Sequence, residues 1–132
     1  MKANNFTVID RRIDKEYWGK DIDITAEKQG FSANIEIKWD TKINKSGAMF
    51  LELLTNIQEN KLGWANFTEA DYIFYGDAQR KVFYIFRVED MREYLREYKN
   101  EYETRVANDY NYHNGLIRKQ SLGAIVPIGL FR

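Results

Sequence analysis

The sequence predicts a mixed α/β domain in which helices flank a central mixed sheet of five to six strands. Two pairs of strand-like stretches predict the sheet: 20–27 with 31–40, and 71–76 with 81–88. The first pair alternates apolar and polar residues, as half-buried strands do. The second pair is apolar on both faces, as central strands covered on both sides are. Residues 89–103 form the clearest helix, because their apolar side chains recur at helical spacing and acidic residues stand at its start.

Shorter patterns complete this order of elements. Apolar residues recur at helical spacing over 6–18, which predicts a short amphipathic helix ended by Gly19. In the rest of the chain we expect a third strand at 47–54, a connection at 56–70 with a helical turn begun by Thr68, a polar loop at 108–115 and a last strand at 121–131. Pro127 places this last strand at an edge of the sheet.

The composition limits the chemistry that the chain can perform. The length of 132 residues fits a single domain, residues 1–132. Cysteine is absent, which excludes disulfides, thiolate zinc sites and cysteine nucleophiles. The one histidine, His113, excludes a zinc site built from several histidines, and it has no nucleophile motif near it that would indicate a Ser-His-Asp triad. No apolar run approaches the roughly 18 residues of a membrane span and no signal peptide is visible, so we expect a cytoplasmic protein without membrane contact.

The register of the first hairpin determines which polar side chains meet. Both strands can place their apolar faces on one core only if the paired positions sum to an odd number, because a slip of one residue turns one strand over. A two-residue loop at Gln29-Gly30 meets this condition and pairs positions that sum to 59. This register sets Asp23 opposite Glu36, and Asp21 opposite Lys38.

Two opposed acids raise the free energy of the fold unless a positive charge lies between them. Lys38 can supply this charge as an ordinary cross-strand partner on a solvated face. Acid-x-lysine triplets of this kind are common by chance, so the triplet alone does not indicate a catalytic site. A divalent cation is the other source of such a charge, because hard oxygen ligands on adjacent strands suit magnesium. Glu52 is a further candidate ligand, since a lone carboxylate in a strand that is apolar on both faces is costly to bury unless it is paired or binds a metal. A strand end or a salt bridge to a lysine would explain Glu52 as well.

The order of these residues resembles the PD-(D/E)xK phosphodiesterase superfamily, which has the restriction-endonuclease-like fold. That pattern is an Asp on one strand and an acid-x-Lys triplet on the next, after an N-terminal helix. Here Asp21 or Asp23 precedes Glu36-Ile37-Lys38, and the expected helix carries acids as well. Small phage and bacterial members share further segments, which in this chain are Asp40, Ser46-Gly47, FLEL with Glu52, Leu62-Gly63-Trp64 and Thr68-Glu69-Ala70-Asp71-Tyr72. The resemblance covers about residues 10 to 88, and Lys20 stands where a proline often precedes the first Asp, which leaves Asp21 and Asp23 as alternatives.

The resemblance implies a reaction and a set of residue roles. One or two Mg²⁺ (or Mn²⁺) ions would be held by Asp21 or Asp23, by Glu36 and by the backbone carbonyl of Ile37. The metal would lower the pKa of a bound water, and Lys38 would orient that water or stabilise the phosphorane. Glu52 and Glu16 would bind a second metal or support the first. No small-molecule cofactor is expected.

Basic and aromatic residues outside this cluster are candidates for substrate contact. Because the formal net charge is zero, binding of nucleic acid needs a local basic patch. Tyr110 and Tyr112, in the polar loop, are candidates for stacking on bases, whereas the tyrosines of 89–103 fit a packed core better. Trp64 fits a packed position better than a stacking one. The candidate nucleic-acid-binding residues are Arg87, Arg92, Arg96, Arg118 and Lys119, although those of the helix alternate with acids as on a solvated face.

These observations favour a Mg²⁺-dependent nuclease of a bacterium or a phage, which hydrolyses DNA and cuts branched DNA or nicks a duplex. A homodimer is compatible with the sequence. The alternative is a catalytically inactive module of the same fold, such as a phage inhibitor of a host defence enzyme or a DNA-binding accessory subunit, which the neutral charge favours. A third hypothesis, a toxin-like RNase, uses the same residues and differs only in substrate.

Overall fold

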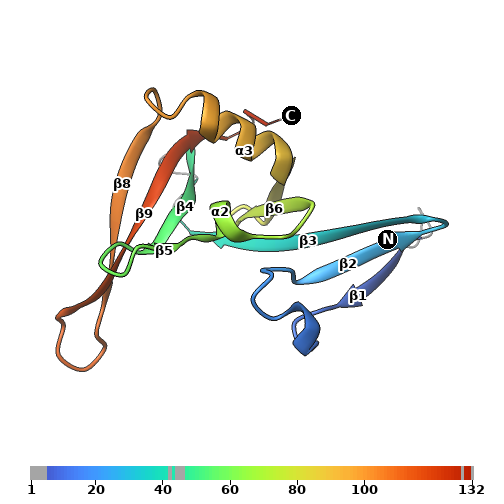
Figure 1. The fold of residues 1–132 in the computed structure, drawn as a ribbon, viewed down its shortest axis with the longest axis horizontal. Helices are drawn as coiled ribbons and strands as arrows, with labels where there is room; N and C mark the ends of the chain where they lie inside the picture. Colours follow the sequence, from blue (N-terminus) through green and yellow to red (C-terminus); the bar gives the residue numbers. More distant parts are fainter. Residues whose placement is uncertain (1–5, 42, 44–46, 129, 132) are drawn as a thin grey trace.

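The computed structural model describes residues 6–41, 43, 47–128 and 130–131, and in this part of the chain nine strands form two sheets (Figure 1). The fold class is mixed α and β, as expected, with sheet predominating. The five-stranded sheet has the order β1 (Thr7–Asp10), β2 (Ile24–Lys28), β3 (Phe31–Asp40), β6 (Tyr72–Asp77) and β7 (Val82–Arg87). The four-stranded sheet has the order β5 (Lys61–Leu62), β4 (Ala48–Asn56), β9 (Ile117–Pro127) and β8 (Glu103–Tyr110). The helical elements are the 3₁₀ turn η2 (Lys15–Tyr17), α2 (Trp64–Phe67) and α3 (Val88–Glu97).

The five-stranded sheet is mixed, because β3 and β6 run parallel while its other strands pair antiparallel. A parallel pair needs a crossover connection. Here the chain leaves β3, passes through β4 and β5 of the second sheet, and returns through α2 to β6. The crossover therefore brings α2 and β4 beside the strands that carry the acid-x-lysine triplet.

The first hairpin has the register that the sequence predicts. Ile24 lies opposite Ile35 and Lys28 opposite Phe31, so paired positions sum to 59. The two-residue loop uses Gly30 at φ 76°, a left-handed conformation that glycine adopts without strain. β2 nevertheless begins only at Ile24, because Asp21 itself has φ 58° and leaves the extended conformation.

The core lies between the two sheets and α3. The five-stranded sheet contributes Ile73 and Phe86, the four-stranded sheet Leu51 and Val126, and α3 Met91, all of them buried. The amphipathic pattern of α3 is confirmed, although the helix runs over Val88–Glu97 and not to residue 103. Burial of these side chains is the main stabilising contribution, at about 1.5–3 kcal/mol for each fully buried large apolar group.

The opposite face of the five-stranded sheet carries exposed apolar side chains. Val8, Phe31, Trp39, Phe83 and Ile85 come from three of its strands, β1, β3 and β7, and are each exposed by 40% or more. The expectation that the 71–76 and 81–88 strands are covered on both sides is therefore wrong for this face. An apolar surface of this kind is typical of an interaction site.

The predicted helix over 6–18 is wrong. Thr7, Val8 and Ile9 are β-branched, and they extend as β1, which pairs with β2 through Val8 opposite Ala26. Only Lys15–Tyr17 turns helically, after Asp14 caps the turn by accepting from the Glu16 amide. Pairing with β2 gives the backbone of β1 hydrogen-bond partners, and the apolar spacing alone does not outweigh this pairing.

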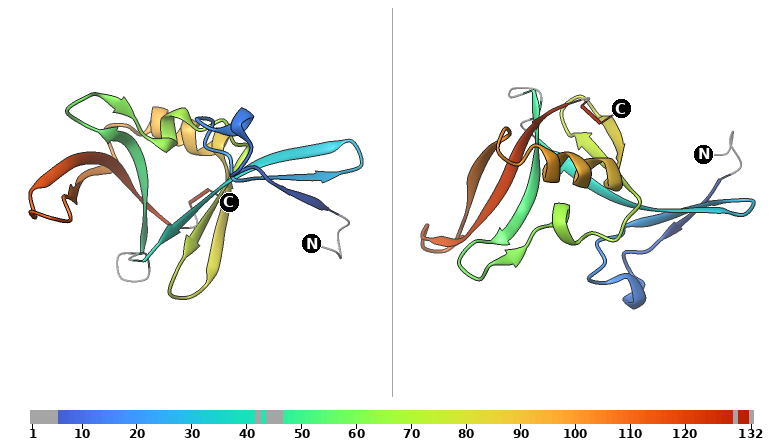
Figure 2. Two further views of the ribbon diagram at one scale, coloured as in Figure 1. Left: turned by 90° about the horizontal axis from the view of Figure 1, so that it is seen from below. Right: turned by 45° about the horizontal axis from the view of Figure 1, so that its top comes forward.

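Four further expectations change with the second sheet. The last strand, β9, is not at an edge, because it lies between β4 and β8 and Pro127 pairs with Ala48 at its end. The strand at 47–54 exists as β4, but the neighbour of β3 is β6, so Glu52 does not stand on the strand next to Glu36. Thr68 ends α2 and does not begin a helical turn. The strand β8 at Glu103–Tyr110 was not expected, and it forms a long hairpin with β9 that points to the opposite end of the molecule from the β2–β3 hairpin (Figures 1 and 2). No helix among the described residues is long and apolar enough to cross a membrane.

Candidate active site

The first hairpin brings Asp23 and Glu36 together. The Asp23 amide donates to the Ile35 carbonyl at 2.9 Å, which continues the ladder one step beyond β2. The Ile37 amide then donates to Asp23 Oδ2 at 2.8 Å and to Glu36 Oε1 at 3.1 Å. One backbone N–H therefore holds two carboxylates side by side, as the predicted register requires.

Asp21 and Lys38 meet through their side chains. Because Asp21 is left-handed, it does not pair with Lys38 in the strand ladder, but Lys38 Nζ lies 3.4 Å from Asp21 Oδ1. The same ammonium lies 5.2 Å from the centroid of the Trp64 ring, at the start of α2. The backbone carbonyl of Asp21 accepts from Thr68 Oγ1 at 2.9 Å, at the end of α2. The α2 segment therefore supports both members of this pair.

Glu36 is the most perturbed acid of the group. Its residue is only 4% exposed, and burial together with hydrogen bonds to the side chains of Asp21 and Asp23 raises the pKa of Glu36 to about 10, although the charge of Lys38 acts in the opposite direction. At neutral pH Glu36 therefore keeps its proton and shares it with the neighbouring aspartates. Its alternation in the sequence indicated a solvated face, and this expectation is wrong, because Glu36 lies beside Ile73 on the face of the sheet that meets the core. The apolar face of β3, with Phe31 and Trp39, is the exposed one.

The carboxylate of Asp21 has one buried oxygen, Oδ2, to which no N–H or hydroxyl group donates, so that the proton of Glu36 or a cation has to satisfy it. An unsatisfied buried acceptor costs about 1–3 kcal/mol. A cation beside Asp21, Asp23 and Glu36 would satisfy this oxygen, and hard carboxylate ligands suit Mg²⁺ or Mn²⁺. Among the described residues, no group of three or more acidic or histidine side chains could hold a metal ion as it stands. The residues thus fit a cation in kind, but the proton of Glu36 would have to leave and the carboxylates would have to turn toward the ion.

Glu52 lies beside Gly63, the residue that precedes α2. Its backbone and side chain pack directly against Gly63, where a Cβ would come within 2.5 Å of the Glu52 carbonyl oxygen and 2.6 Å of its Cγ. Trp64, the residue after Gly63, contacts Lys38. Glu52 packs against one of these two neighbouring residues and Lys38 against the other. No hydrogen bond or ion pair joins Glu52 to the cluster in the described part of the chain, and its role as a metal ligand stays a prediction. Glu16 is exposed on the η2 turn.

The five predicted nucleic-acid-binding residues do not gather at the cluster. Arg92 donates to the carbonyls of Ala65, Asn66 and Thr68 at 3.3, 3.2 and 2.5 Å, so its guanidinium holds the end of α2. Arg87 pairs with Glu89 at 2.6 Å, and Arg96 is exposed on α3. A groove of about 620 Å³ lies along these three arginines, but it also contains acids of the β6 and α3 segments.

Arg118 and Lys119 lie on the long β8–β9 hairpin. Arg118 forms an ion pair with Asp109, and Lys119 Nζ lies 3.4 Å from Thr55 Oγ1. Tyr112 is 96% exposed in the turn between β8 and β9, and this hairpin points away from the β2–β3 hairpin in the views of Figures 1 and 2. These residues therefore form a surface separate from the carboxylates.

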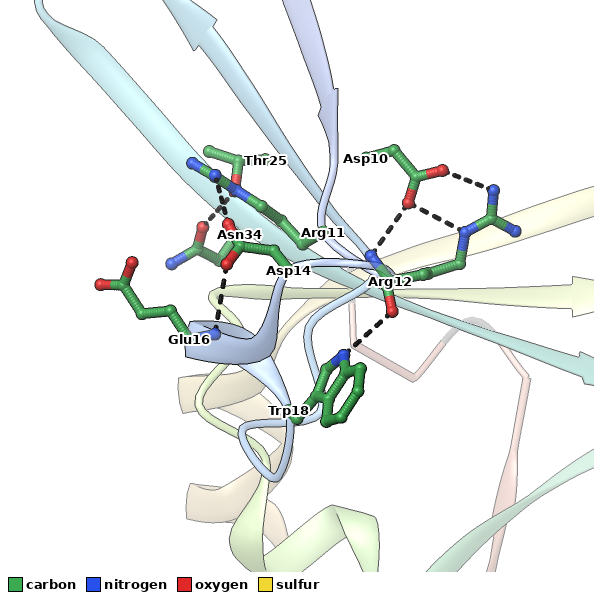
Figure 3. Close-up of polar contacts among 8 residues, drawn as sticks. All are labelled: Asp10, Arg11, Arg12, Asp14, Glu16, Trp18, Thr25 and Asn34. Carbon is green, nitrogen blue, oxygen red and sulfur yellow. Dashed lines mark hydrogen bonds and ion pairs between the residues drawn. The ribbon is translucent and has the colours of Figure 1, made fainter.

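The residues that do adjoin the carboxylates come from the segment expected as a helix. A shallow, open cavity of about 270 Å³ is lined by Asp21 and Asp23, by Arg11, Arg12 and Trp18, and by Phe67 of α2. The loop that carries them is held by polar contacts (Figure 3). Arg11 Nε donates to Thr25 Oγ1 at 2.9 Å, and Arg12 pairs with Asp10 at 2.7 Å. The run of Arg11, Arg12 and Trp18 shortly before Asp21 is the signal in the sequence that could have located this cavity.

Comparison with models of protein families, with curated proteins and with solved structures gives no match.

Proposed function

We propose that the chain is a Mg²⁺-dependent phosphodiesterase of restriction-endonuclease-like fold that hydrolyses DNA. The observation that carries the proposal is the buried Asp21 oxygen to which no N–H or hydroxyl group donates, in a cluster with Asp23 and the buried Glu36. A protein rarely keeps three acids in contact around an unsatisfied oxygen without a functional reason. Lys38, 3.4 Å from Asp21, completes an acid-x-lysine site.

The fold supports this proposal at a coarser level. A mixed sheet of five strands carries the first Asp before β2 and the triplet on β3, which is the arrangement that the resemblance to PD-(D/E)xK nucleases implies. The crossover through α2 then covers the polar face of β3 and makes it a partly buried site. The second sheet, β5-β4-β9-β8, extends beyond the part of the chain that the resemblance covers.

In this proposal Asp21, Asp23, Glu36 and the carbonyl of Ile37 hold Mg²⁺ or Mn²⁺. The bound ion supplies a water of lowered pKa and neutralises charge on the phosphate. The chain's own groups prepare the site: the Ile37 amide orients the Asp23 carboxylate at 2.8 Å, and Trp64 supports the Lys38 ammonium at 5.2 Å. Lys38 has a side chain 26% exposed, so it can donate to a phosphate oxygen in the transition state while its stem stays packed.

A panel of substrates tests this function. Single-stranded, duplex, flapped and four-way DNA, together with RNA, are incubated with Mg²⁺ or Mn²⁺ and the wild type, Glu36→Ala or Lys38→Ala. The matched controls are Glu27→Ala and Lys28→Ala, exposed residues of the same hairpin. We expect metal-dependent cleavage of DNA that both site variants lose and both controls keep. Cleavage by a folded Lys38→Ala protein at the wild-type rate would contradict the assigned chemistry, and cleavage of RNA alone would point to an RNase.

A non-catalytic binding module is the second candidate. The exposed apolar face of the five-stranded sheet favours it, because a protein partner can bind to such a surface. The scattered arginines favour it as well, because a DNA-binding groove would gather them on one surface. It requires that no nucleic acid in the panel is cut with either metal and that a titration with Mg²⁺ produces no heat. The homodimer stays a prediction.

A further inference from the structure

We propose that the cavity beside Asp21 and Asp23 binds the base of one unpaired nucleotide, so that the substrate is DNA with a single-stranded segment next to the bond that is cut. This inference rests on the proposed function, because it places a nucleotide beside the candidate metal ligands. The residues that carry it are Arg11, Arg12, Trp18, Asp21, Asp23 and Phe67. We refer to this cavity as the base slot.

The base slot has aromatic walls and an acidic end. Trp18 comes from the loop before β2 and is 61% exposed, and Phe67 comes from α2 and is 37% exposed. Both line the same space as Asp21 and Asp23. Large aromatic side chains at the surface, beside carboxylates that would hold a metal, offer a flat apolar surface to a base whose phosphate lies at the ion.

Trp18 is held in place before any ligand binds. Its indole Nε1–H donates to the Arg12 carbonyl at 3.1 Å, and the ring stands clear of the strands (Figure 3). Gly19 follows at φ 82° and turns the chain sharply after the ring. An exposed ring that is already oriented loses little conformational entropy on binding, which is the condition for an effective stacking surface. Stacking on such a ring contributes roughly 5- to 150-fold in affinity per base.

Cations around the ring can meet the phosphates that flank the base. Arg12 forms a fork with Asp10, at 2.7 and 3.0 Å, but its side chain is 69% exposed. An exposed pair of this kind contributes little to stability, so a phosphate can share the guanidinium. Lys15 Nζ lies 6.0 Å from the centroid of the Trp18 ring. Arg11 is fixed more firmly, since it bonds Thr25 and its guanidinium lies 4.3 Å from the Tyr17 ring.

The exposed ring face in the base slot favours an unpaired base over a duplex. The slot's volume of about 270 Å³ lies just below the usual range for small-ligand pockets, which begins at about 300 Å³. A base inside a duplex has both faces covered by its neighbours and cannot stack on Trp18 until it leaves the helix. The slot therefore discriminates by strandedness, with little reading of sequence.

Binding without turnover tests the inference. A labelled single-stranded oligonucleotide and a blunt duplex of the same length are titrated by fluorescence anisotropy against wild type, Trp18→Ala, Trp18→Phe and the control Trp39→Ala. The titrations are run in EDTA and again in Ca²⁺, which supplies a divalent charge. Trp39 is a matched control, because it is 59% exposed and lies on the opposite face of the five-stranded sheet. We expect Trp18→Ala to weaken single-stranded binding at least 5-fold and duplex binding less than 2-fold, Trp18→Phe to retain most of the affinity, and Trp39→Ala to bind as wild type.

A second readout does not depend on the fold of the Trp18→Ala protein. In Trp39→Phe, Trp18 is the exposed indole and Trp64 is 7% exposed, so fluorescence quenching by oligo(dT) reports on Trp18. Quenching that saturates with binding supports the inference. Its absence, equal losses for single strand and duplex, or no binding of single strands by wild type in either buffer would overturn it. Trp18-dependent binding without cleavage would overturn the proposed function alone, and cleavage of nucleic acid that ignores Trp18 would overturn the base slot alone.

Discussion

Lys38 forms an ion pair with only one of the two carboxylate oxygens of Asp21. Lys38 Nζ lies 3.4 Å from Asp21 Oδ1, while Asp21 Oδ2 is buried and no N–H or hydroxyl group donates to it. If the lysine only neutralised a surface acid, water would form a hydrogen bond with the other carboxylate oxygen. Here the oxygen is buried, and Asp21 belongs to a group of acids in which burial raises the pKa of Glu36 to about 10. The acids around this pair outnumber its one lysine, and we therefore expect that the cluster can bind one more cation.

The stability of the metal-free protein should fall as the pH rises. The pKa of Glu36 is raised from 4.5 to about 10, so the folded state keeps a proton that the unfolded state releases between these values. The contribution of Glu36 to stability is therefore complete below about pH 4.5 and decreases through the window up to pH 10, by at most about 1.4 kcal/mol per pH unit. Glu36→Gln, which cannot ionise, should flatten this dependence and unfold at a higher temperature than wild type above pH 7.

Thermal unfolding in EDTA at a series of pH values measures this effect. Glu27→Gln is the matched control, because Glu27 is exposed on β2 of the same hairpin. Its curve should follow the wild type throughout. If Glu36→Gln keeps the full pH dependence of the wild type, Glu36 is ionised in the folded protein and the account of the cluster is wrong.

Arg92→Ala should destabilise the fold and should not act as the loss of a nucleic-acid contact. Of its three hydrogen bonds to carbonyls of the α2 segment, those to Ala65 and Thr68 are partly shielded from water, and their loss leaves acceptors unpaired at the end of that segment. We expect a decrease in the free energy of unfolding of about 2 kcal/mol. Arg96→Ala, on the exposed side of α3, should change it by less than about 0.5 kcal/mol. Urea unfolding of both variants decides between these roles, and equal stabilities would show that Arg92 does not hold α2.

Trp64 should influence turnover through Lys38. Its ring lies 5.2 Å from the Lys38 ammonium, and a cation–π contact of this kind contributes about 0.5–2 kcal/mol. Trp64→Leu should therefore lower kcat by roughly 2- to 30-fold without a matching change in KM. Trp64→Phe keeps an aromatic face and should recover most of kcat. Steady-state kinetics on the preferred substrate measures both, and a Phe variant as slow as the Leu variant would mean that Trp64 acts by packing alone.

The sequence was sufficient to predict the local geometry of the site. The register of the first hairpin follows from alternation and loop length, and it correctly joins Asp23 to Glu36. The contact of Asp21 with Lys38 also forms, but by a different route, since a left-handed Asp21 reaches Lys38 with its side chain. The alternation of apolar and polar residues predicts which side chains share a face of the strand. It does not predict the residue at which the strand begins.

What lies across from that face was beyond the sequence pattern. Glu36 looks solvated in a list of alternating residues, yet it is buried beside Ile73 on the face of the sheet that meets the core, and such a contact joins residues far apart in the chain. The apolar spacing over 6–18 indicated a helix, but pairing with β2 decided the outcome and hid the loop that carries Trp18. Arg92 looked like a surface charge because a sequence does not show which carbonyls a helix end leaves free.

A calorimetric titration with Mg²⁺ tests the central claim most directly, since it asks whether the cluster around Asp21 binds a divalent cation. We predict saturable binding to the wild type that releases the Glu36 proton, so the measured heat should change with the ionisation enthalpy of the buffer. Asp21→Asn should lose at least about 10-fold in affinity, while Asp109→Asn, a control on the β8–β9 hairpin, should bind as wild type. Absence of binding to the wild type, or equal affinity in Asp21→Asn, would contradict the account.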